Sequence, residues 1–349
     1  MSTKLRFISG LILLVNILFT PAIFAVEQKQ IFILHSYENN HVCGLPQSQG
    51  VKRGLAKAGY DDSKITYQSY AMDTKRTNNT AELIEAQAEI ALDKISQFQP
   101  DLLIVLDDNA FRSVALKLVD TKLPIVFSGM NNLPQRYNET TKWLDSLDAP
   151  GHNITGVYEK IHFSTAVKVQ KKIQPQLTRL RILSDNSPTG QALMRQIKLE
   201  LKHNPIPAEV DFFITDSWEQ YQQKILETNQ SNIDAMYPIA LRLIDADGKG
   251  YGGSEILTWT SRNANKPSIP LNFAFVKLGL LGGAGVDFES MGYQAGQIAS
   301  RILSGALAGS IAIEDAKRYA LVFNLKRAQE LEIEIPQDIL LAADEVYQD

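Results

Sequence analysis

The feature that most constrains the fold is a regular alternation of apolar runs with helix-like stretches. The first half of the chain carries four apolar runs that are typical of strands, namely IFILHSY, ITYQSYAM, LLIVLDD and PIVFSGM. Between the second and third runs, apolar side chains recur at helical spacing and form one stripe, made of Ile84, Ala88, Ala91, Leu92 and Ile95. This alternation predicts a parallel sheet with helices on both faces.

The same pattern restarts in the second half of the chain. Residues 132–152 interrupt it with two prolines and many polar residues, and we interpret them as a linker. Four further runs are predicted to be strands, namely LRILSD, EVDFFIT, IDAMYPIAL and SIPLNFAF. A C-terminal helix follows, with an apolar stripe of Met291, Ala295, Ile298, Ala299 and Ile302. The 349 residues are therefore expected to form two α/β units in tandem.

The N-terminus has the pattern of a secretory signal peptide. Lys4 and Arg6 precede an apolar core at residues 11–19, and Ala25 offers a cleavage site. This core is shorter than the roughly 20 residues that a membrane-spanning helix needs. We therefore exclude residues 1–25 from the fold and expect a mature protein in the periplasm. Since no cysteine lies near the cleavage site, a lipid anchor there is excluded.

Charge and cysteine content narrow the choice of partners. Removal of Lys4 and Arg6 from the 35 basic residues leaves 33, against 39 acidic residues, a net charge of −6. This charge argues against nucleic acid or an anionic membrane surface as a main partner. The only cysteine, Cys43, cannot form an intramolecular disulfide, and we interpret it as a structural thiol.

The motifs of nucleotide, metal and catalytic sites do not fit this chain. GLLGGAG lacks the GxGxxG spacing, so no nucleotide cofactor is expected. DADGKG begins like an EF-hand loop, but Ile256 stands where a bidentate glutamate is required. His35 and His41 could approach each other, yet no third metal ligand follows them. Asp107 and Asp108 would point to opposite faces of a strand, so they cannot act as a catalytic pair, and we expect no enzyme.

Polar and aromatic residues gather at the predicted strand ends. In parallel sheets these ends share one edge, where α/β proteins bind ligands. Two such edges that face each other form a cleft for a small polar or aromatic molecule. The candidate ligand-binding residues are Ser36, Tyr37, Asp108, Asn109, Asn131, Asn132, Tyr158, Asp185, Ser187, Thr189, Tyr237 and Asn272. In the alternative interpretation, Asp108 or Asn109, and Ser187, only cap helices.

The two most specific segments of the chain are the tail LVFNLKRAQELEIEIPQDILLAADEV and the helix GVDFESMGYQAGQIASRILSG. They resemble a family of ABC-transporter substrate-binding proteins. PIVFSGMNN, NITGVY and KRGLAKAGY support the resemblance, which covers nearly the whole chain after residues 1–25. Some relatives bind aromatic amino acids, and others are extracytoplasmic sensor halves of kinases or cyclases with an opening similar to ILHSY.

The resemblance implies a type I periplasmic-binding-protein fold. Such an α/β protein has two Rossmann-like lobes with parallel sheets, which are joined by three crossing strands and close on a ligand. By this comparison, lobe one covers residues 26–152 plus 272–308, and lobe two covers residues 153–271 plus 309–349. The resemblance also assigns cleft positions to Ser36, Tyr37, Asp108, Asn131 and Asp185.

The implied function is capture of a small molecule for an ABC importer with a permease in the inner membrane. The alternative is a soluble receptor that feeds a membrane kinase or cyclase, and both remain open at this point. The ligand could be an amino acid or a related metabolite. Relatives often carry Thr or Asp after the strand that ends at Tyr237, whereas this chain has Pro238, Ile239 and Ala240, so the identity of the ligand stays open.

Specific roles follow for five of the candidates. Tyr37 and Tyr237 would cover a flat ligand from opposite lobes, which is worth about 0.5–1.5 kcal/mol beyond burial. Asp108 would accept a hydrogen bond from a ligand ammonium. Ser36 and Asn131 would fix the orientation of the ligand through neutral hydrogen bonds.

Removal of the signal peptide is the first testable prediction. We expect the mature protein to begin at or close to Val26, because export removes the apolar segment that ends at Ala25. N-terminal sequencing of protein from the exporting cell measures this directly. An intact Met1 on a membrane-bound protein would contradict it.

Overall fold

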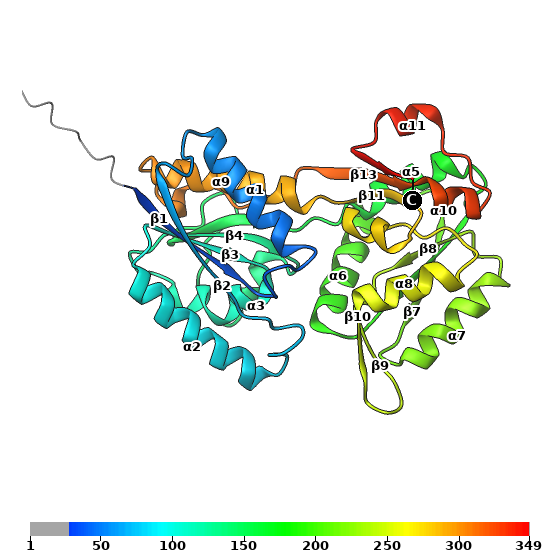
Figure 1. Ribbon diagram of the computed structural model, residues 1–349, viewed down its shortest axis with the longest axis horizontal. Helices are drawn as coiled ribbons and strands as arrows, with labels where there is room; N and C mark the ends of the chain where they lie inside the picture. Colours follow the sequence, from blue (N-terminus) through cyan, green and yellow to red (C-terminus); the bar gives the residue numbers. More distant parts are fainter. Residues whose placement is uncertain (1–27, 349) are drawn as a thin grey trace, which may run out of the picture.

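The computed structural model describes residues 28–348, which form two lobes side by side (Figure 1). Lobe one contains the N-terminal strands, and lobe two contains the middle of the chain together with the C-terminal segment. The predicted signal peptide, residues 1–25, lies outside the described residues. Within the part described, no helix combines the length and the apolar character that crossing a bilayer requires.

Lobe one is built on six parallel strands in the order β12-β5-β4-β3-β1-β2. They are β1 (Lys29–His35), β2 (Ile65–Ala71), β3 (Leu102–Leu106), β4 (Ile125–Met130), β5 (Ile154–Tyr158) and β12 (Glu314–Asp315). All side chains of β3 are buried, as in a central strand that is covered on both faces. The parallel sheet predicted for this unit is confirmed.

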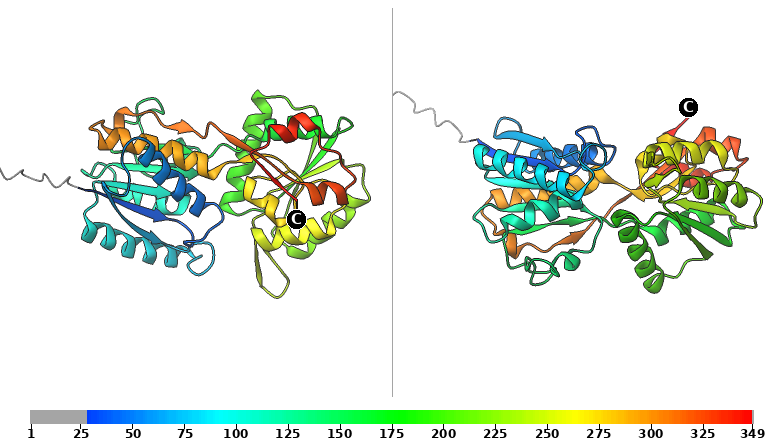
Figure 2. Two further views of the ribbon diagram at one scale, coloured as in Figure 1. Left: turned by 45° about the horizontal axis from the view of Figure 1, so that its top comes forward. Right: turned by 90° about the horizontal axis from the view of Figure 1, so that it is seen from below.

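Helices cover both faces of the lobe-one sheet (Figures 1 and 2). They are α1 (Gly44–Lys57), α2 (Ala81–Phe98), α3 (Asp108–Ser113), α4 (Pro134–Tyr137) and α9 (Phe288–Leu303), with the short 3-10 turns η1 (Ala115–Leu118) and η3 (Ala308–Ser310). Ile31 and Ile33 of β1 join the core under α1 and α9, whereas Phe32 and Leu34 join the core under α2 and α3. Because successive strand side chains point to opposite faces, one apolar strand serves two cores.

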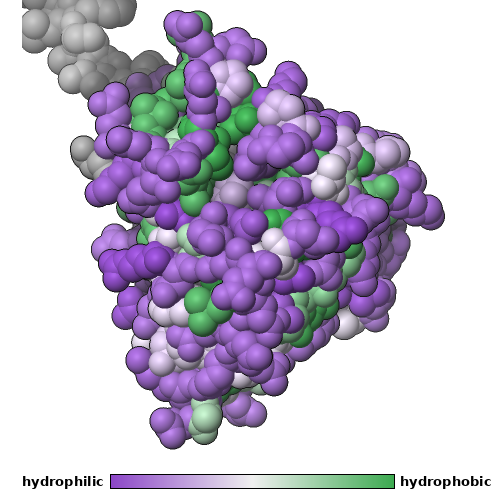
Figure 3. Space-filling model, turned by 90° about the vertical axis from the view of Figure 1, so that its right-hand side faces the viewer, coloured by the Kyte–Doolittle hydropathy of each residue, from purple (hydrophilic) through white to green (hydrophobic). Residues whose placement is uncertain are grey.

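Lobe two contains a parallel sheet, β7-β6-β8, and a mixed sheet, β11-β13-β14. Its strands are β6 (Arg179–Ser184), β7 (Glu209–Ile214), β8 (Ala235–Pro238), β9 (Arg242–Ile244), β10 (Gly250–Gly252), β11 (Gly282–Val286), β13 (Tyr319–Asn324) and β14 (Glu345–Tyr347). Its helices are α5 (Phe163–Ile173), α6 (Pro188–His203), α7 (Trp218–Asn229), α8 (Gly253–Asn263), α10 (Leu325–Glu330) and α11 (Gln337–Leu341). Figure 3 views the outer end of the molecule on this side, where hydrophilic side chains cover most of the surface.

The chain crosses between the lobes three times, as the predicted fold requires. The first crossing leads from β5 to α5, the second from β11 to α9, and the third from β12 to β13. The crossings run together, because Ala316 donates to Tyr158 O at 3.0 Å and Val286 pairs with Tyr319. Connections of this kind are the usual location of a hinge between two lobes.

The crossings lie at other residues than we predicted. Residues 132–152 are not a linker, because Trp143 is fully buried in lobe one, with its ring 4.9 Å from that of Phe111. β5 then extends the lobe-one sheet, so the first crossing follows residue 158 and not residue 152. β11 pairs in lobe two and β12 pairs in lobe one, so the boundaries predicted at 272 and 308 move to the segments after residues 286 and 315.

The run SIPLNFAF does not form the predicted strand. It makes only isolated bridges, from Ser268 to Met236 and from Asn272 to Val286, before the 3-10 helix η2 (Phe273–Leu278) begins. Pro270 has no N–H to donate to a ladder, which prevents continuous pairing of this segment.

Four glycines allow α1 and α9 to pack backbone against backbone. Gly50 and Gly54 of α1 face α9, and Gly292 and Gly296 of α9 face α1. A Cβ atom on Gly292 would overlap the backbone oxygen of Gln47, and a Cβ atom on Gly50 would overlap that of Glu289. Only glycine leaves room for such a close approach.

Replacement of Gly292 by alanine tests this contact. The added methyl group would meet a backbone carbonyl, so we expect Gly292→Ala to lower the free energy of unfolding by about 2 kcal/mol or more. The control is Gly250→Ala, because a Cβ atom there meets open space. Urea unfolding compares the two variants. Equal stability would show that the helices can separate without cost.

Candidate ligand-binding site

The carboxyl ends of the lobe-one strands meet at an edge that faces lobe two (Figure 1). Backbone pairing continues past the strand ends, since Asp107 N donates to Ser128 O at 2.9 Å. In the same way Glu159 N donates to Met130 O at 2.8 Å. We call this region the lobe-one edge, which comprises residues 35–47, 73–75, 107–109, 128–132 and 158–159.

Ser36 links strands within the lobe-one edge. Its hydroxyl donates to Leu106 O at 2.7 Å and accepts from Ala110 N at 2.8 Å. The side chain is fully buried. Because one donor and one acceptor site are already used, Ser36 holds β1 against the start of α3 instead of presenting a free hydroxyl to a ligand.

Asp108 is a structural anchor in the same way. Its carboxylate accepts from Asn131 N at 2.8 Å, from Asn132 Nδ2 at 3.1 Å and from the Tyr137 hydroxyl at 2.6 Å. These donors come from the loop after β4 and from α4, so Asp108 ties that segment to α3. The expected free carboxylate for a ligand ammonium is therefore occupied by protein donors. The capping alternative does not apply either, because Asp108 is the first residue of α3 and makes no cap.

The lobe-two candidates at the start of α6 also serve the backbone. Asp185 accepts from Ser187 N at 2.8 Å and from Leu241 N at 2.6 Å, and it is almost fully buried. Ser187 caps α6, accepting from Gly190 N at 3.1 Å, which agrees with the alternative interpretation. Thr189 lies half-buried in the first turn of α6.

The two tyrosine rings do not form the predicted pair. Tyr237 has no exposed surface and packs edge to face on Phe163 in the core, with ring centroids 5.1 Å apart. Tyr37 does lie at the lobe-one edge, where the Lys75 ammonium sits 3.7 Å above its ring and His41 lies against it. The Tyr237 side chain points into the apolar core between its sheet and the helices that cover the sheet. The end of β8 therefore does not present this ring to a ligand, as the sequence pattern had suggested.

Two of the remaining candidates, Asn131 and Asn132, lie where the lobes touch. Asn131 O accepts from Gln196 Nε2 of α6 at 2.9 Å, and Asn132 Oδ1 accepts from Arg195 Nη2 at 2.7 Å. Asn109 stays within lobe one and donates to Thr74 Oγ1 at 2.9 Å.

Two further candidates flank these contacts. Asn272 caps η2 and points its amide nitrogen at the Cys43 sulfur, 4.0 Å away in lobe one. Tyr158 lines a pocket of about 220 Å³ together with Gln196 and Glu200 of α6 and with Asp315. Both residues therefore lie at the junction of the lobes.

Residues outside the predicted set of ligand-binding residues carry the free polar atoms of the lobe-one edge. Among the described residues, nine buried side-chain polar atoms have no hydrogen-bond partner, and five belong to this edge. The five are His35 Nδ1, Glu38 Oε2, Gln47 Oε1, Asp73 Oδ1 and Ser128 Oγ. A buried polar atom without a partner costs about 1–3 kcal/mol, so such a cluster is typical of a site that a ligand completes.

Burial also shifts the acid–base chemistry of this edge. Burial raises the pKa of Asp107 to about 7, with help from Asp108 and against the effect of Lys75. Burial, followed by repulsion from Asp107, raises the pKa of Glu159 well above its ordinary value. Burial lowers the pKa of His35 to about 4, so its imidazole is neutral at pH 7 and Nδ1 can accept or donate according to its tautomer.

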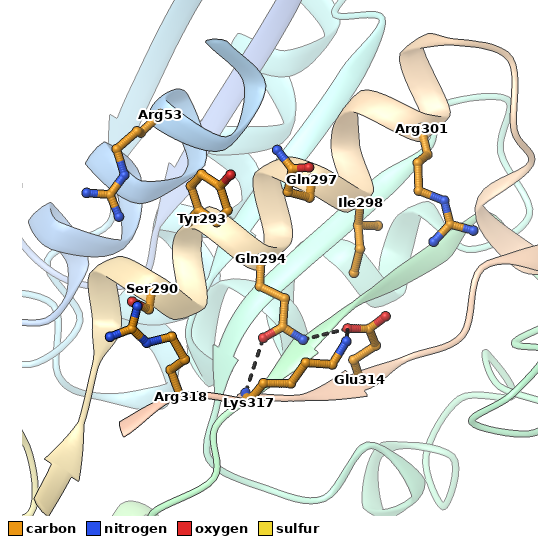
Figure 4. Close-up of a pocket in the computed structure, with 10 residues that line it drawn as sticks. All are labelled: Arg53, Ser290, Tyr293, Gln294, Gln297, Ile298, Arg301, Glu314, Lys317 and Arg318. Atoms are coloured by element: carbon orange, nitrogen blue, oxygen red, sulfur yellow. Dashed lines mark hydrogen bonds and ion pairs between the residues drawn. The ribbon is translucent and has the colours of Figure 1, made fainter. Parts of the chain in front are cut away.

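A groove of about 570 Å³ lies apart from the lobe-one edge, along α9 and the segment after β12 (Figure 4). Most of its polar side chains already have partners, and Gln294 Nε2 donates to Glu314 Oε2 at 2.6 Å. Three of its cations form ion pairs, Arg53 with Glu289, Lys317 with Glu314 and Arg318 with Asp344. Among the described residues, none of the buried side-chain atoms without a hydrogen-bond partner belongs to this groove, in contrast to the lobe-one edge.

Comparison with known families gives a match over most of the chain. The family described as ABC transporter substrate binding protein matches residues 40–347. A tyrosine-binding protein of Clostridioides difficile (strain R20291) is 20% identical over 289 residues, which are 80% of this chain and 75% of that protein. The family predicted from the sequence is confirmed, and it is a family of solute-binding proteins and not of enzymes.

Solved structures share the fold. The ABC domain in complex with L-Trp from Streptococcus pneumonia has a TM-score of 0.68 at 20% identity, covering 92% of this chain and 100% of that chain. The ligand-free, open structure of a substrate binding protein with adhesive properties from Clostridium difficile has a TM-score of 0.68 at 17% identity, with the same coverage. At these identities the likeness concerns the fold, and the predicted type I fold is confirmed.

Substitution of Asp108 tests whether its carboxylate stabilises the fold or contacts the ligand. Asp108→Asn replaces one accepting oxygen by an amide that faces protein donors, so we expect the free energy of unfolding to fall by about 2 kcal/mol. Asp93→Asn, on the exposed side of α2, is the matched control. Thermal unfolding measures both. A melting temperature that stays unchanged while ligand affinity falls would instead make Asp108 a ligand contact.

Proposed function

Because this chain belongs to the ABC transporter substrate-binding protein family, we propose that it captures an amino acid or a related metabolite between its lobes and delivers it to an ABC importer. The partner would be the permease of that importer in the inner membrane. The signal-peptide pattern of residues 1–25 supports export to the periplasm, where such a protein meets its ligand.

The observation that carries this proposal is the cluster of unsatisfied polar atoms at the lobe-one edge. His35 Nδ1, Gln47 Oε1 and Ser128 Oγ are buried, and none has a hydrogen-bond partner in the part of the chain described here. A small ligand with donors and acceptors would supply the missing bonds. Its polar groups would then fix its orientation in the cleft.

Similarity to amino-acid-binding proteins supports the class of ligand. One relative is named for tyrosine, and one structural neighbour was solved with L-Trp. An amino acid presents an ammonium, a carboxylate and a side chain within a few bonds. The lobe-one edge offers neutral acceptors, buried carboxyls and the Tyr37 ring with Lys75 above it, which can match all three parts.

Ligand binding is expected to close the lobes. Gln196 already reaches from α6 of lobe two to Asn131 O and Glu159 O of lobe one, at 2.9 and 3.0 Å. A ligand that contacts both lobes gains its full set of bonds only in the closed form, so binding shifts the population toward closure.

A screen of amino acids by thermal unfolding, followed by solution scattering, tests the proposed function. We expect at least one amino acid to raise the melting temperature, because it binds only the folded state. The same amino acid should reduce the radius of gyration. A radius that stays constant at saturation would argue for a rigid binding module.

A pair of buried glutamines provides a matched control for the location of the site. Gln47 and Gln170 both lie on helices, are fully buried and have an unpartnered Oε1 atom. We expect Gln47→Leu to weaken binding about tenfold, which corresponds to one lost hydrogen bond of about 1.4 kcal/mol. Gln170→Leu, on α5, should leave the affinity unchanged. Equal affinities of the two variants would place the ligand elsewhere.

A further inference from the structure

The lobe-one edge contains two buried carboxyl groups that no basic side chain neutralises directly. Asp107 follows β3, and Glu159 follows β5 in the first crossing between the lobes. Their exposed fractions are 3% and 2%. Neither belongs to any ion pair with a lysine, arginine or histidine among residues 28–348. A buried carboxylate without such a partner is costly, so each group favours its protonated form.

Each carboxyl also has few hydrogen-bond donors. Asp107 Oδ1 accepts from Gln47 Nε2 at 3.4 Å, which is a long bond. Glu159 Oε2 accepts from Asn131 Nδ2 at 3.1 Å. Asp108, by comparison, has donors from three residues and is fully satisfied. The two buried carboxyls thus retain accepting capacity for a donor that the protein does not supply.

The charges around the pair do not compensate it. Lys75 is the cation that lowers the pKa of both groups, and its exposed ammonium lies over the Tyr37 ring. Asp108 adds negative charge next to both. Burial raises the pKa of Tyr37 and of Cys43, so both face the pair as neutral groups. One exposed ammonium therefore stands against three carboxyl groups.

We propose that the carboxyl pair of Asp107 and Glu159 receives the ammonium group of the ligand and releases a proton to solvent when the ligand binds. This inference rests on the proposed function and adds the residues that receive the ammonium group and the release of a proton that accompanies binding. The ammonium brings a positive charge in place of the carboxyl proton that is released, and its N–H groups donate to the free accepting positions of the two carboxyls. An uncharged or N-acylated ligand cannot make this exchange.

The direction of the pH dependence follows from the exchange. The ligand favours the charged carboxylate, so it lowers the pKa of the pair, and acid opposes binding. For one group with a pKa of about 7, binding should be about twentyfold weaker at about pH 5.5 than at about pH 7.5. Above the pKa the affinity should become independent of pH.

The test uses the full mature protein with the standard L-amino acids and their N-acetyl derivatives as probes. The derivatives keep the carboxylate and the side chain but lack the ammonium. Titration calorimetry at neutral pH in phosphate and in Tris, which differ in ionisation enthalpy, measures the protons released. We expect release for the free amino acid that binds, weaker binding in acid, and loss of at least tenfold in affinity for its N-acetyl form.

Two variants with one control locate the effect. Glu159→Gln and Asp107→Asn keep the size of the side chain, and each should reduce proton release and flatten the pH profile. Asp211→Asn, on the exposed strand β7, should change neither. If the two variants fail to fold, the pH profile and the number of protons released by the unchanged protein still show whether binding of the ligand releases a proton.

The outcomes separate this inference from the proposed function. Binding of a free amino acid without proton release, or with equal affinity for its N-acetyl form, overturns the inference and leaves the proposed function intact. Absence of binding by every amino acid contradicts both.

Discussion

The contact between the backbones of α1 and α9 is the constraint on which the rest of lobe one depends. It joins a helix near the N-terminus to one that begins at residue 288, directly after the second crossing. Gly50, Gly54, Gly292 and Gly296 are needed because the helices approach too closely for a Cβ atom. The contact therefore fixes both the start of α1, which carries Gln47, and the position of one hinge strand.

The lobe-one edge uses its polar side chains in two ways. Ser36 and Asp108 spend their hydrogen-bonding capacity on neighbouring backbone and side chains, which makes the strand ends rigid. The rigid strand ends keep Gln47 Oε1 and Ser128 Oγ buried without a hydrogen-bond partner. On a flexible loop, the same side chains would turn toward water. Gly129, with φ of 81°, permits this arrangement because a Cβ atom there would collide with the Gln47 amide.

Much of the fold could be predicted from the sequence, because strand and helix periodicity is local information. The β3 run is buried as its pattern predicted, and so is the apolar stripe on α2, apart from the half-buried Leu92. The crossings were misplaced because polar composition suggested a linker at residues 132–152. There Trp143 finds its partners Phe111 and Phe127 across the fold, and no local pattern reveals such a contact.

For the candidate site, the sequence predicted the location at the edge of the sheet but not which side chains there have free polar atoms. Sequence shows that Asp108 follows a strand, but whether its carboxylate is free depends on Tyr137, 29 residues further along the chain. Equally, Gln47 lies within a helix and Glu159 in a crossing segment, where residue type alone gives no reason to select them. The distinction between an anchor and a free acceptor is set by tertiary partners.

The position of Glu159 connects charge to motion. Its backbone oxygen accepts from Gln196 of α6 at 3.0 Å, while its side chain belongs to the buried carboxyl pair of lobe one. Glu159 is thus part of a crossing and is held by the opposite lobe, so a change in the charge of its side chain affects the contact between the lobes. In the proposed mechanism an ammonium group that binds here stabilises the carboxylate and the contact with α6 together. Neutralisation of the buried carboxylate by the ammonium and closure of the two lobes then favour each other, since the same ligand stabilises both. A ligand without the ammonium would leave the Glu159 side chain protonated. Closure of the lobes would then contribute less to the binding free energy of that ligand.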